Sequence, residues 1–158
     1  MKRQFILTTP IGLLYITSED NCITRVAVSC DRKVQLCNVL TDFELSVKKQ
    51  IEEYFYGKRT IFDFPFIIKE GTLFQQSVWR ELCKIPYGVT RSYGEIARCI
   101  GKQGASRAVG TACNRNPLLL VVPCHRVIGS DGSLVGFSCG LDRKSFLLGI
   151  EGRKLSIF

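Results

Sequence analysis

One dipeptide of this chain, Cys124-His125, places a nucleophile beside a base. A thiol attacks carbon as its thiolate, and a nearby imidazole can take up the thiol proton at neutral pH. The chain has a single histidine, so any Cys–His chemistry must use this residue. Catalytic Cys and His residues usually meet in space rather than in sequence, however, and buried cysteines are often inert. A core cysteine beside a hydrogen-bonded histidine therefore remains the alternative interpretation.

An apolar run from Leu118 to Val122 lies just before Cys124. A short, continuous apolar run of this kind is typical of a fully buried strand. We therefore predict a strand over 118–122 that delivers Cys124 to a fixed position at its end.

The first 70 residues have the pattern of a scaffold. Short β-rich runs cover 4–8, 13–18 and 23–29, and turn-forming residues separate them. Thr41 and Glu44 form a capping-box pattern at the start of a helix that Gly57 ends. A strand and a linker are predicted over 62–71. Nothing in this part of the chain suggests catalytic chemistry.

Residues 71–158 have the pattern of a winged helix-turn-helix. A capping box at Thr72 begins one helix, and two short helices, 93–100 and 105–113, follow with a glycine turn between them. Residues 127–128 and 134–135 flank a turn, which predicts a hairpin wing. A last helix begins near residue 141, with an inner face formed by Phe146, Leu147 and Ile150. The predicted fold class is α/β (α+β), with a small sheet-plus-helix domain at 1–70 and a winged helix-turn-helix domain at 71–158.

The helix predicted over 105–113 is rich in small residues, and Arg107 is its one long charged side chain. Gly110 inside this helix costs about 1 kcal/mol relative to alanine, so some other interaction should offset it. Small side chains let a helix backbone approach another surface closely. That surface is either the protein's own core or a nucleic acid that Arg107 contacts.

The net charge of +8 is concentrated in the second half of the chain. Residues 71–158 hold twelve Lys and Arg against five Asp and Glu, whereas residues 1–70 are almost neutral. A basic half that also carries the candidate nucleophile suggests an anionic partner such as DNA or RNA. The alternative is charge that serves solubility alone.

Eight cysteines suggest neither a disulfide framework nor a metal site. The N-terminal apolar stretch is too short for a secretory signal, and no two cysteines have the Cys-x-x-Cys spacing. No apolar run approaches the length of a membrane helix. We therefore expect a cytoplasmic protein without a metal and without a membrane partner.

Several motifs occur in an order that resembles one family, the O6-alkylguanine-DNA alkyltransferases, also called methylated-DNA–protein-cysteine methyltransferases. The motifs are Pro86-Tyr87-Gly88, Ser92-Tyr93-Gly94, Ser106-Arg107-Ala108-Val109-Gly110, Asn116-Pro117, Pro123-Cys124-His125-Arg126-Val127, and Lys144 with Leu147, Leu148 and Glu151. The resemblance is dense from Thr72 to Glu151 and looser before it. It implies an RNase H-like first domain, a winged-helix second domain, and repair of DNA by transfer of an alkyl group from guanine O6, and often thymine O4, to the protein's own cysteine.

The resemblance also implies roles for individual residues. Cys124 would accept the alkyl group, with His125 as base through a water, Glu151 orienting the imidazole, Asn116 holding a turn, and Tyr93 acting on the base and its phosphate. The DNA-binding set would be Arg107, which fills the vacated stack, with Tyr93, Ala105, Ser106, Ala108, Gly110, Thr111, Asn114 and Arg126. The substrate pocket would contain Cys113, Val127, Phe137, Ser138 and Cys139.

The implied partner is double-stranded DNA carrying O6-alkylguanine, contacted in its minor groove by a monomer that needs no cofactor. Phe137 and Cys139 depart from the residues common in the family, which leaves the tolerated alkyl size open. Two other functions stay open: a winged-helix protein that binds DNA lesions without reacting, and a cysteine hydrolase, against which the helix-turn-helix argues.

Overall fold

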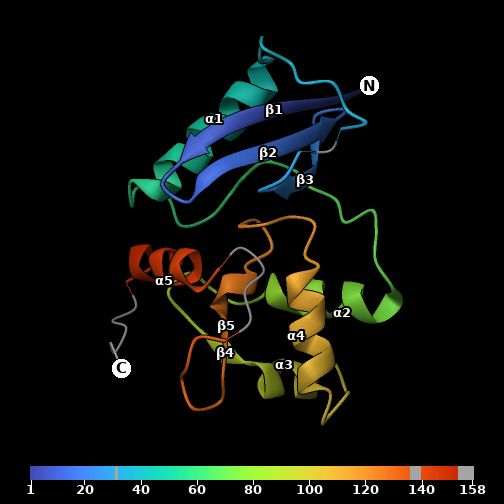
Figure 1. Ribbon diagram of the computed structural model, residues 1–158, viewed down its shortest axis with the longest axis vertical. Helices are drawn as coiled ribbons and strands as arrows, with labels where there is room; N and C mark the ends of the chain where they lie inside the picture. The colour runs from blue at the N-terminus through green and yellow to red at the C-terminus, as the bar shows by residue number, and fades with distance from the viewer. Residues whose placement is uncertain (31, 136–139, 153–158) are drawn as a thin grey trace. The chain divides into compact units, whose positions relative to one another are not determined.

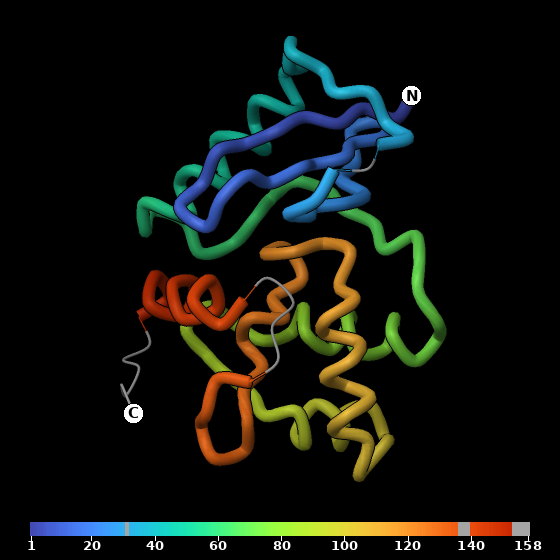
Figure 2. Tube along the Cα trace, in the orientation of Figure 1, coloured from blue at the N-terminus to red at the C-terminus, as the bar shows by residue number. Residues whose placement is uncertain are grey.

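The computed structural model describes residues 1–30, 32–135 and 140–152. The chain divides into two compact units, the first formed by 1–69 with 117–119, and the second by 70–116 with the residues from 120 onward. The course of the chain in each unit can be followed in Figures 1 and 2.

The first unit is a three-stranded antiparallel sheet with one helix. The strands β1 (Lys2–Thr9), β2 (Gly12–Glu19) and β3 (Cys22–Ala27) pair in sequence order. The β2–β3 turn has positive φ angles at Asp20 and Asn21, as a tight hairpin turn with the twist of its strands requires. The helix α1 (Asp42–Phe55) lies along this sheet (Figure 1) and buries Val47 and Ile51. These elements confirm the predicted sheet-plus-helix pattern.

The capping boxes predicted from the sequence are present at two helices. The Thr41 hydroxyl accepts from the Glu44 amide at the start of α1, and the Glu44 carboxylate accepts from the Thr41 amide. The same reciprocal pair, Thr72 with Gln75, begins α2 (Leu73–Leu82). Each pair satisfies amides that a helix N-terminus leaves without an internal partner.

The second unit contains the helix-turn-helix. The helices α2, α3 (Tyr93–Cys99) and α4 (Ser106–Asn114) pack against one another. The indole N–H of Trp79 on α2 donates to the carbonyl of Ala112 on α4 (2.8 Å). Positive φ angles at Gly101 and Gly104 form the turn between α3 and α4. The helix α5 (Leu141–Ile150) packs against a single 3-10 turn, η1 (Cys124–Arg126).

Three sequence expectations are wrong in detail. Residues 118–122 are buried except for the half-buried Val121, but they form isolated bridges and a turn, with φ of 73° at Leu120, and not a strand. The strand expected within 62–71 is only a single bridge between Ile23 and Phe66. Phe146, expected on the inner face of α5, is exposed, and Lys144 is buried on that helix instead.

The wing also differs from a simple hairpin. The strand β5 (Val127–Ile128) pairs in parallel with β4 (Arg91–Ser92), just before α3. The chain then reverses through a turn closed by the Gly129 amide and the Ser133 carbonyl (2.9 Å). Within the described residues no second wing strand follows this turn.

Candidate active site

A turn rather than a strand positions Cys124. The left-handed conformation at Leu120 redirects the chain, and the Cys124 amide then donates to the Val122 carbonyl (2.8 Å). Cys124 begins η1, so its backbone is fixed on both sides by local hydrogen bonds. Its side chain is only 3% exposed. A buried sulfur on a rigid turn suits a nucleophile that must meet its substrate in one geometry.

Asn116 connects this turn to the sulfur atom. Its side-chain amide donates to the Val122 carbonyl (2.7 Å) and lies 3.3 Å from Cys124 Sγ, in position to donate to it. A donor directed at sulfur stabilises the negative charge of a thiolate. Asn116 therefore both holds the turn and favours the reactive form of the thiol.

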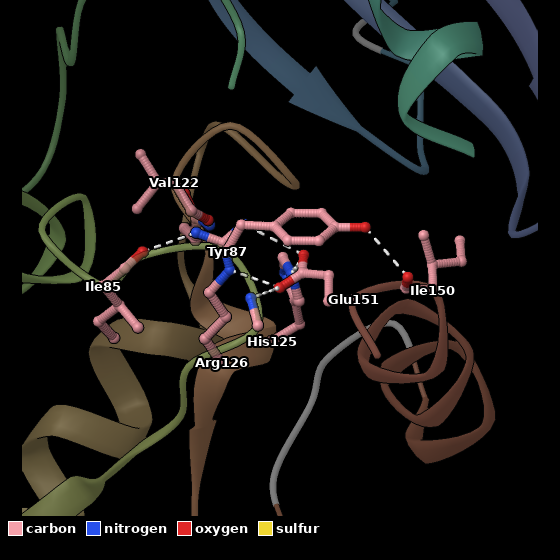
Figure 3. Close-up of polar contacts among 9 residues, drawn as sticks. Ile85, Tyr87, Val122, His125, Arg126, Ile150 and Glu151 are labelled. Atoms are coloured by element: carbon pink, nitrogen blue, oxygen red, sulfur yellow. Dashed lines mark hydrogen bonds and ion pairs between the residues drawn. The ribbon is translucent and has the colours of Figure 1, made fainter. Parts of the chain in front are cut away.

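His125, Arg126 and Glu151 form a buried network around one carboxylate (Figure 3). Glu151 Oε2 lies 2.7 Å from His125 Nε2 and 3.1 Å from Arg126 Nη2. Glu151 Oε1 accepts from Arg126 Nε at 2.7 Å. This bidentate pairing compensates for the burial of both charges and keeps Glu151 ionised.

Glu151 fixes which nitrogen of His125 can act as a base. A carboxylate only accepts hydrogen bonds, so Nε2 carries the proton and Nδ1 has a lone pair. Nδ1 is buried and has no hydrogen-bond partner among the described residues. Burial lowers the pKa of His125 below its ordinary value, and the positive charges of Arg126 and Lys144 add to this, against the opposing effect of Glu151. The imidazole is therefore neutral at pH 7 and can accept a proton at Nδ1.

Backbone groups complete the support of this network. Arg126 Nη1 donates to the Ile85 carbonyl (2.7 Å), and the Tyr87 hydroxyl donates to the Ile150 carbonyl (3.0 Å), next to Glu151 (Figure 3). The Gly88 amide donates to Glu151 Oε1 (3.4 Å). The segment that follows α2 thus holds the end of α5 in place.

A second buried thiol, Cys113, lies within electrostatic range of Cys124. Burial raises the pKa of Cys113 far above its ordinary value, and the charge of Cys124 raises it further, although Lys144 opposes this. Cys113 is therefore a protonated, inert thiol. Of the two thiols that are buried in the described part of the chain, Cys124 is the one with an amide donor at its sulfur and a histidine next to it in the sequence.

A cleft of about 280 Å³ opens on one side of α4. Its lining residues are Tyr93, Ser106, Arg107, Gly110, Asn114 and Val135. The Tyr93 hydroxyl donates to the Val135 carbonyl (2.7 Å), and burial raises the pKa of Tyr93 above its ordinary value. Tyr93 therefore remains protonated and can donate a hydrogen bond.

Known proteins match the chain over nearly its whole length. Two family models match, the ribonuclease-like domain of 6-O-methylguanine DNA methyltransferase at residues 2–68 and its DNA binding domain at residues 73–153. The chain belongs to this family.

Individual relatives agree with the family models. A methylated-DNA–protein-cysteine methyltransferase of Methanosarcina acetivorans is 44% identical over 151 residues, which cover 93% of this chain and 96% of the relative. One of Mycolicibacterium paratuberculosis is 45% identical, over 92% and 89% of the two chains. The crystal structure of Mycobacterium tuberculosis OGT in complex with DNA is 39% identical, with a TM-score of 0.88 over 94% of this chain and 92% of that chain. The predicted fold class, with a ribonuclease-like first part, is confirmed.

The methyltransferase fold brings most of the predicted site residues into two groups. The first surrounds the sulfur and consists of Asn116, Cys124, His125 and Glu151. The second lies on or beside α4. Arg107, Ala108, Thr111 and Asn114 are exposed on this helix, Ala105, Ser106, Gly110 and Tyr93 are half-buried, and Cys113 is buried. Val127 is buried in β5, outside both groups. Phe137, Ser138 and Cys139 lie outside the described residues.

The expectation that Arg126 contacts DNA is not supported. Its side chain is 11% exposed and its guanidinium is committed to Glu151 and to the Ile85 carbonyl. Arg126 instead neutralises and orients the carboxylate that holds His125.

Sequence reasoning quoted Lys144 in a motif without giving it a role, and it missed Val135. Lys144 is completely buried, and its Nζ lies 3.3 Å from the Tyr93 hydroxyl and 3.0 Å from the Val135 carbonyl. A signal was present for Lys144, because it lies three and four positions before the buried pair Leu147 and Leu148 and so shares their helix face. Val135 acts through its backbone carbonyl, which leaves no signal in the sequence.

Neither a metal site nor a membrane span is found in the described part of the chain. No group of three or more His, Cys, Asp and Glu side chains there is arranged to hold a metal ion. None of the helices there is both long and apolar enough to cross a bilayer.

Proposed function

We propose that this methyltransferase repairs DNA by irreversible transfer of an alkyl group from guanine O6, and from thymine O4, to Cys124. The observation on which this proposal depends is the environment of Cys124 Sγ, which has an amide donor at 3.3 Å and, at the next residue, a histidine held by a buried carboxylate. Relatives that align over most of the chain are methylated-DNA–protein-cysteine methyltransferases, which supports this reaction class.

The reaction needs a base, a soft nucleophile and a leaving group. His125 Nδ1 takes the thiol proton through a water molecule, and the Asn116 amide stabilises the resulting thiolate. The sulfur attacks the alkyl carbon, so that a carbon–sulfur bond forms as the carbon–oxygen bond breaks. The guanine leaves with the electron pair and regains the proton that the thiol lost. The product is a thioether, and each protein molecule therefore acts once.

The DNA side of the reaction is assigned to the second unit. The lesion lies inside the base stack, and turning it out costs a few kcal/mol. The exposed Arg107 on α4 fills the vacated space, and exposed basic residues of α3, of α4 and of the turn between them bind the phosphates. Because the side chains of this helix are small, α4 can lie in the minor groove with its backbone close to the bases. A single copy of the chain contains all of these groups, so we infer that it acts as a monomer.

The two parts of the chain have different roles in this proposal. Residues 1–70 serve as the scaffold, and residues 71–158 bind DNA and carry the acceptor. Tyr93 donates to the everted base within the cleft beside Gly110, and Ser138, with the carbonyls of Cys124 and Val127, reads the base edge. That the protein acts in the cytoplasm and needs no cofactor remains a prediction.

The test uses duplex DNA with one O6-methylguanine. We expect a single added methyl group, mapped by mass spectrometry to the peptide that contains Cys124, and restored guanine in the DNA. Cys124→Ser should abolish both, whereas Cys99→Ser, which removes an exposed thiol of the same unit, should leave them unchanged. Methylation at another residue would overturn the assignment of the acceptor. Binding of the lesion with no loss of free thiol would instead indicate a non-reacting lesion-binding protein.

A further inference from the structure

The strand β1 is an edge strand, because the strands of the first unit pair in the order β1-β2-β3 (Figure 1). An edge strand leaves a row of N–H and C=O groups without a partner in its own sheet, and another extended chain can pair with them. Proteins commonly protect such an edge with a charged side chain, a bulge or a covering segment. In the described part of the chain, the edge of β1 is covered over only part of its length.

A hydrogen bond at Gln4 shows which residues of β1 face outward. The Gln4 carbonyl accepts from the Cys37 amide (2.7 Å), and Gln4 forms a parallel bridge with Leu36. The backbone of Gln4 therefore points away from β2. Strand residues alternate with a period of two, and the N–H and C=O of one residue in an antiparallel pair point to the same side. The backbone groups of Ile6 and Thr8 therefore also point outward.

The covering segment does not continue along β1 to these two residues. Arg3 Nη2 donates to the Val39 carbonyl (2.7 Å), which keeps this part of the segment near the start of β1. No described residue forms a hydrogen bond with the outward-facing backbone groups of Ile6 and Thr8, and both side chains are exposed. The edge at these two residues is therefore open to a short extended segment.

A groove of about 610 Å³ borders the open edge. Its wall includes four large apolar side chains that are each more than a third exposed, Ile6, Leu36, Val39 and Leu45. Single exposed apolar residues are normal on a protein surface, whereas several around one groove are typical of a binding site. We call the groove and the open edge together the β1 groove. Its remaining lining residues are Phe5, Cys37, Asn38, Leu40 and Lys48.

Lys48 gives the β1 groove its charge preference. It is the one charged residue that lines the groove in the described part of the chain, and no carboxylate does. Lys48 Nζ lies 4.0 Å from Glu52 Oε1, and both side chains are about half exposed, so this pair contributes little and is easily exchanged for another partner. An extended segment with apolar side chains and an acidic residue therefore complements the site.

We propose that the β1 groove binds an extended, acidic segment of another protein by strand addition. The main chain of the segment pairs with Ile6 and Thr8, its alternate side chains enter the groove, and a carboxylate lies at Lys48. Main-chain pairing supplies affinity in this type of recognition, and the pockets for side chains supply selectivity. The first unit contains none of the groups to which alkyl transfer is assigned, so docking here links the protein to a partner without occupying the site of that reaction.

The first experiment identifies a ligand and locates it. A phage library of random peptides is panned against the full-length protein, and the strongest binder is synthesised for calorimetry and for NMR titration of isotope-labelled protein. We expect the selected sequences to alternate apolar and polar residues and to contain Asp or Glu. The amide signals of Ile6 and Thr8 should shift most on binding. Binders that shift signals elsewhere overturn the inference, as does a library that yields no binder.

A matched pair of variants tests the main-chain pairing. Thr8→Pro removes the outward-facing N–H at a position of an edge strand where proline is tolerated, whereas Thr8→Ala keeps this N–H and removes only the side chain. We expect Thr8→Pro to weaken peptide binding by about fivefold or more and Thr8→Ala by less than about twofold. Equal effects of the two variants contradict strand addition. Should Thr8→Pro lose its cooperative thermal transition, methylation of single peptide nitrogens replaces it, and binding should then be lost at alternate positions only.

Side-chain variants test the groove itself. Ile6→Lys should weaken binding by about tenfold or more, whereas Ile67→Lys, at an isoleucine that is 47% exposed and does not line the groove, should leave it unchanged. Lys48→Met and conversion of the peptide's acidic residue to its amide should each weaken binding by about threefold, and together by no more than either alone. Equal losses in the two lysine variants, or full additivity of the charge changes, overturn the assignment of the groove.

Other occupants of the β1 groove would give different results. A dimer of the peptide-free protein that Thr8→Pro dissociates in sedimentation velocity would show that a second copy of the chain binds there, and would overturn the proposed partner. Displacement of the peptide by undamaged duplex DNA would do the same for a nucleic acid. Methyl transfer from O6-methylguanine duplex should be unchanged in every variant, because none of them alters the second unit. Failure of the wild-type protein to transfer a methyl group would therefore overturn the proposed function alone.

Discussion

Glu151 contacts two side chains in the buried network, and the two contacts have different effects. It accepts from His125 with one oxygen, and Arg126 contacts both of its oxygens. The first contact selects the histidine tautomer that leaves Nδ1 free for a proton, and the second keeps the carboxylate ionised. The same residue therefore contributes to reactivity and to stability, and a substitution should affect both.

We expect Glu151→Gln to slow methyl transfer and also to lower the free energy of unfolding by about 3 kcal/mol, because Arg126 keeps a buried charge without its counter-ion. Affinity for undamaged duplex should remain, since none of these groups is exposed. Single-turnover kinetics, urea denaturation and a binding titration measure the three quantities. Glu95→Gln, at an exposed carboxylate on α3, is the control and should change none of them appreciably. An unchanged transfer rate in Glu151→Gln would contradict the role of Glu151.

At the scale of the element, the position of Gly110 inside α4 needs an explanation, because glycine is unfavourable in the interior of a helix. A Cβ atom built at Gly110 would meet the ring of Tyr93 at 3.8 Å, which is ordinary contact. The protein's own packing therefore does not require glycine there, and of the two explanations considered for this helix, close approach to another molecule is favoured. The cleft that Gly110 lines is the surface that a side chain would fill.

Gly110→Ala should therefore separate stability from function. We expect the unfolding free energy to rise by up to about 1 kcal/mol, the difference in helix propensity, while the reaction with O6-methylguanine duplex becomes slower. Gly149→Ala is a matched control, because a Cβ at this position of α5 meets nothing within 4 Å. It should not slow the reaction. A destabilised Gly110→Ala protein would show that packing against the protein's own core is the reason for the glycine.

Arg107 supplies a second prediction for α4. Its side chain is exposed and lies at the rim of the cleft, where it can replace a base in the stack but is not needed for chemistry at sulfur. We expect Arg107→Ala to reduce the rate on duplex DNA by an order of magnitude more than the rate with free O6-benzylguanine, since only the duplex needs base extrusion. Arg80→Ala, on exposed α2 surface, serves as the control. Equal losses with both substrates would contradict the wedge role.

At the scale of the whole molecule, the single histidine couples stability to pH. Its pKa is lowered in the folded protein, mainly by burial, whereas in the unfolded chain it returns to about 6.5. Below that pH the unfolded state binds more protons, so the stability that His125 contributes is complete above about pH 6.5 and is lost as the pH falls toward the folded-state pKa.

Urea denaturation between pH 7.5 and 5.5 measures this coupling. We expect the free energy of unfolding to fall by no more than about 1.4 kcal/mol per pH unit, the limit for one proton. Because the chain has no other histidine, the slope in this window reports His125. His125→Asn should flatten it. A wild-type protein whose stability does not change over this range would show that the folded histidine is not held neutral.

The sequence alone identified what its local patterns encode. Two capping boxes and the glycine turn between α3 and α4 depend on residues a few positions apart, and all of them are present as predicted. The ordered motifs also identified the family, because reactive groups at fixed places in the chain are characteristic of it. The strand assigned to 118–122 was wrong, since a buried turn is as apolar as a buried strand.

Only the tertiary structure decided which distant groups meet and in what state. It turned Arg126 inward to Glu151, 25 positions away, and brought Lys144 to a tyrosine 51 positions away. It also placed the Asn116 amide at the Cys124 sulfur, whereas no described residue supplies such a donor to the buried Cys113. Burial and the direction of hydrogen bonds set the charge of a side chain, and both depend on which residues the fold packs around it.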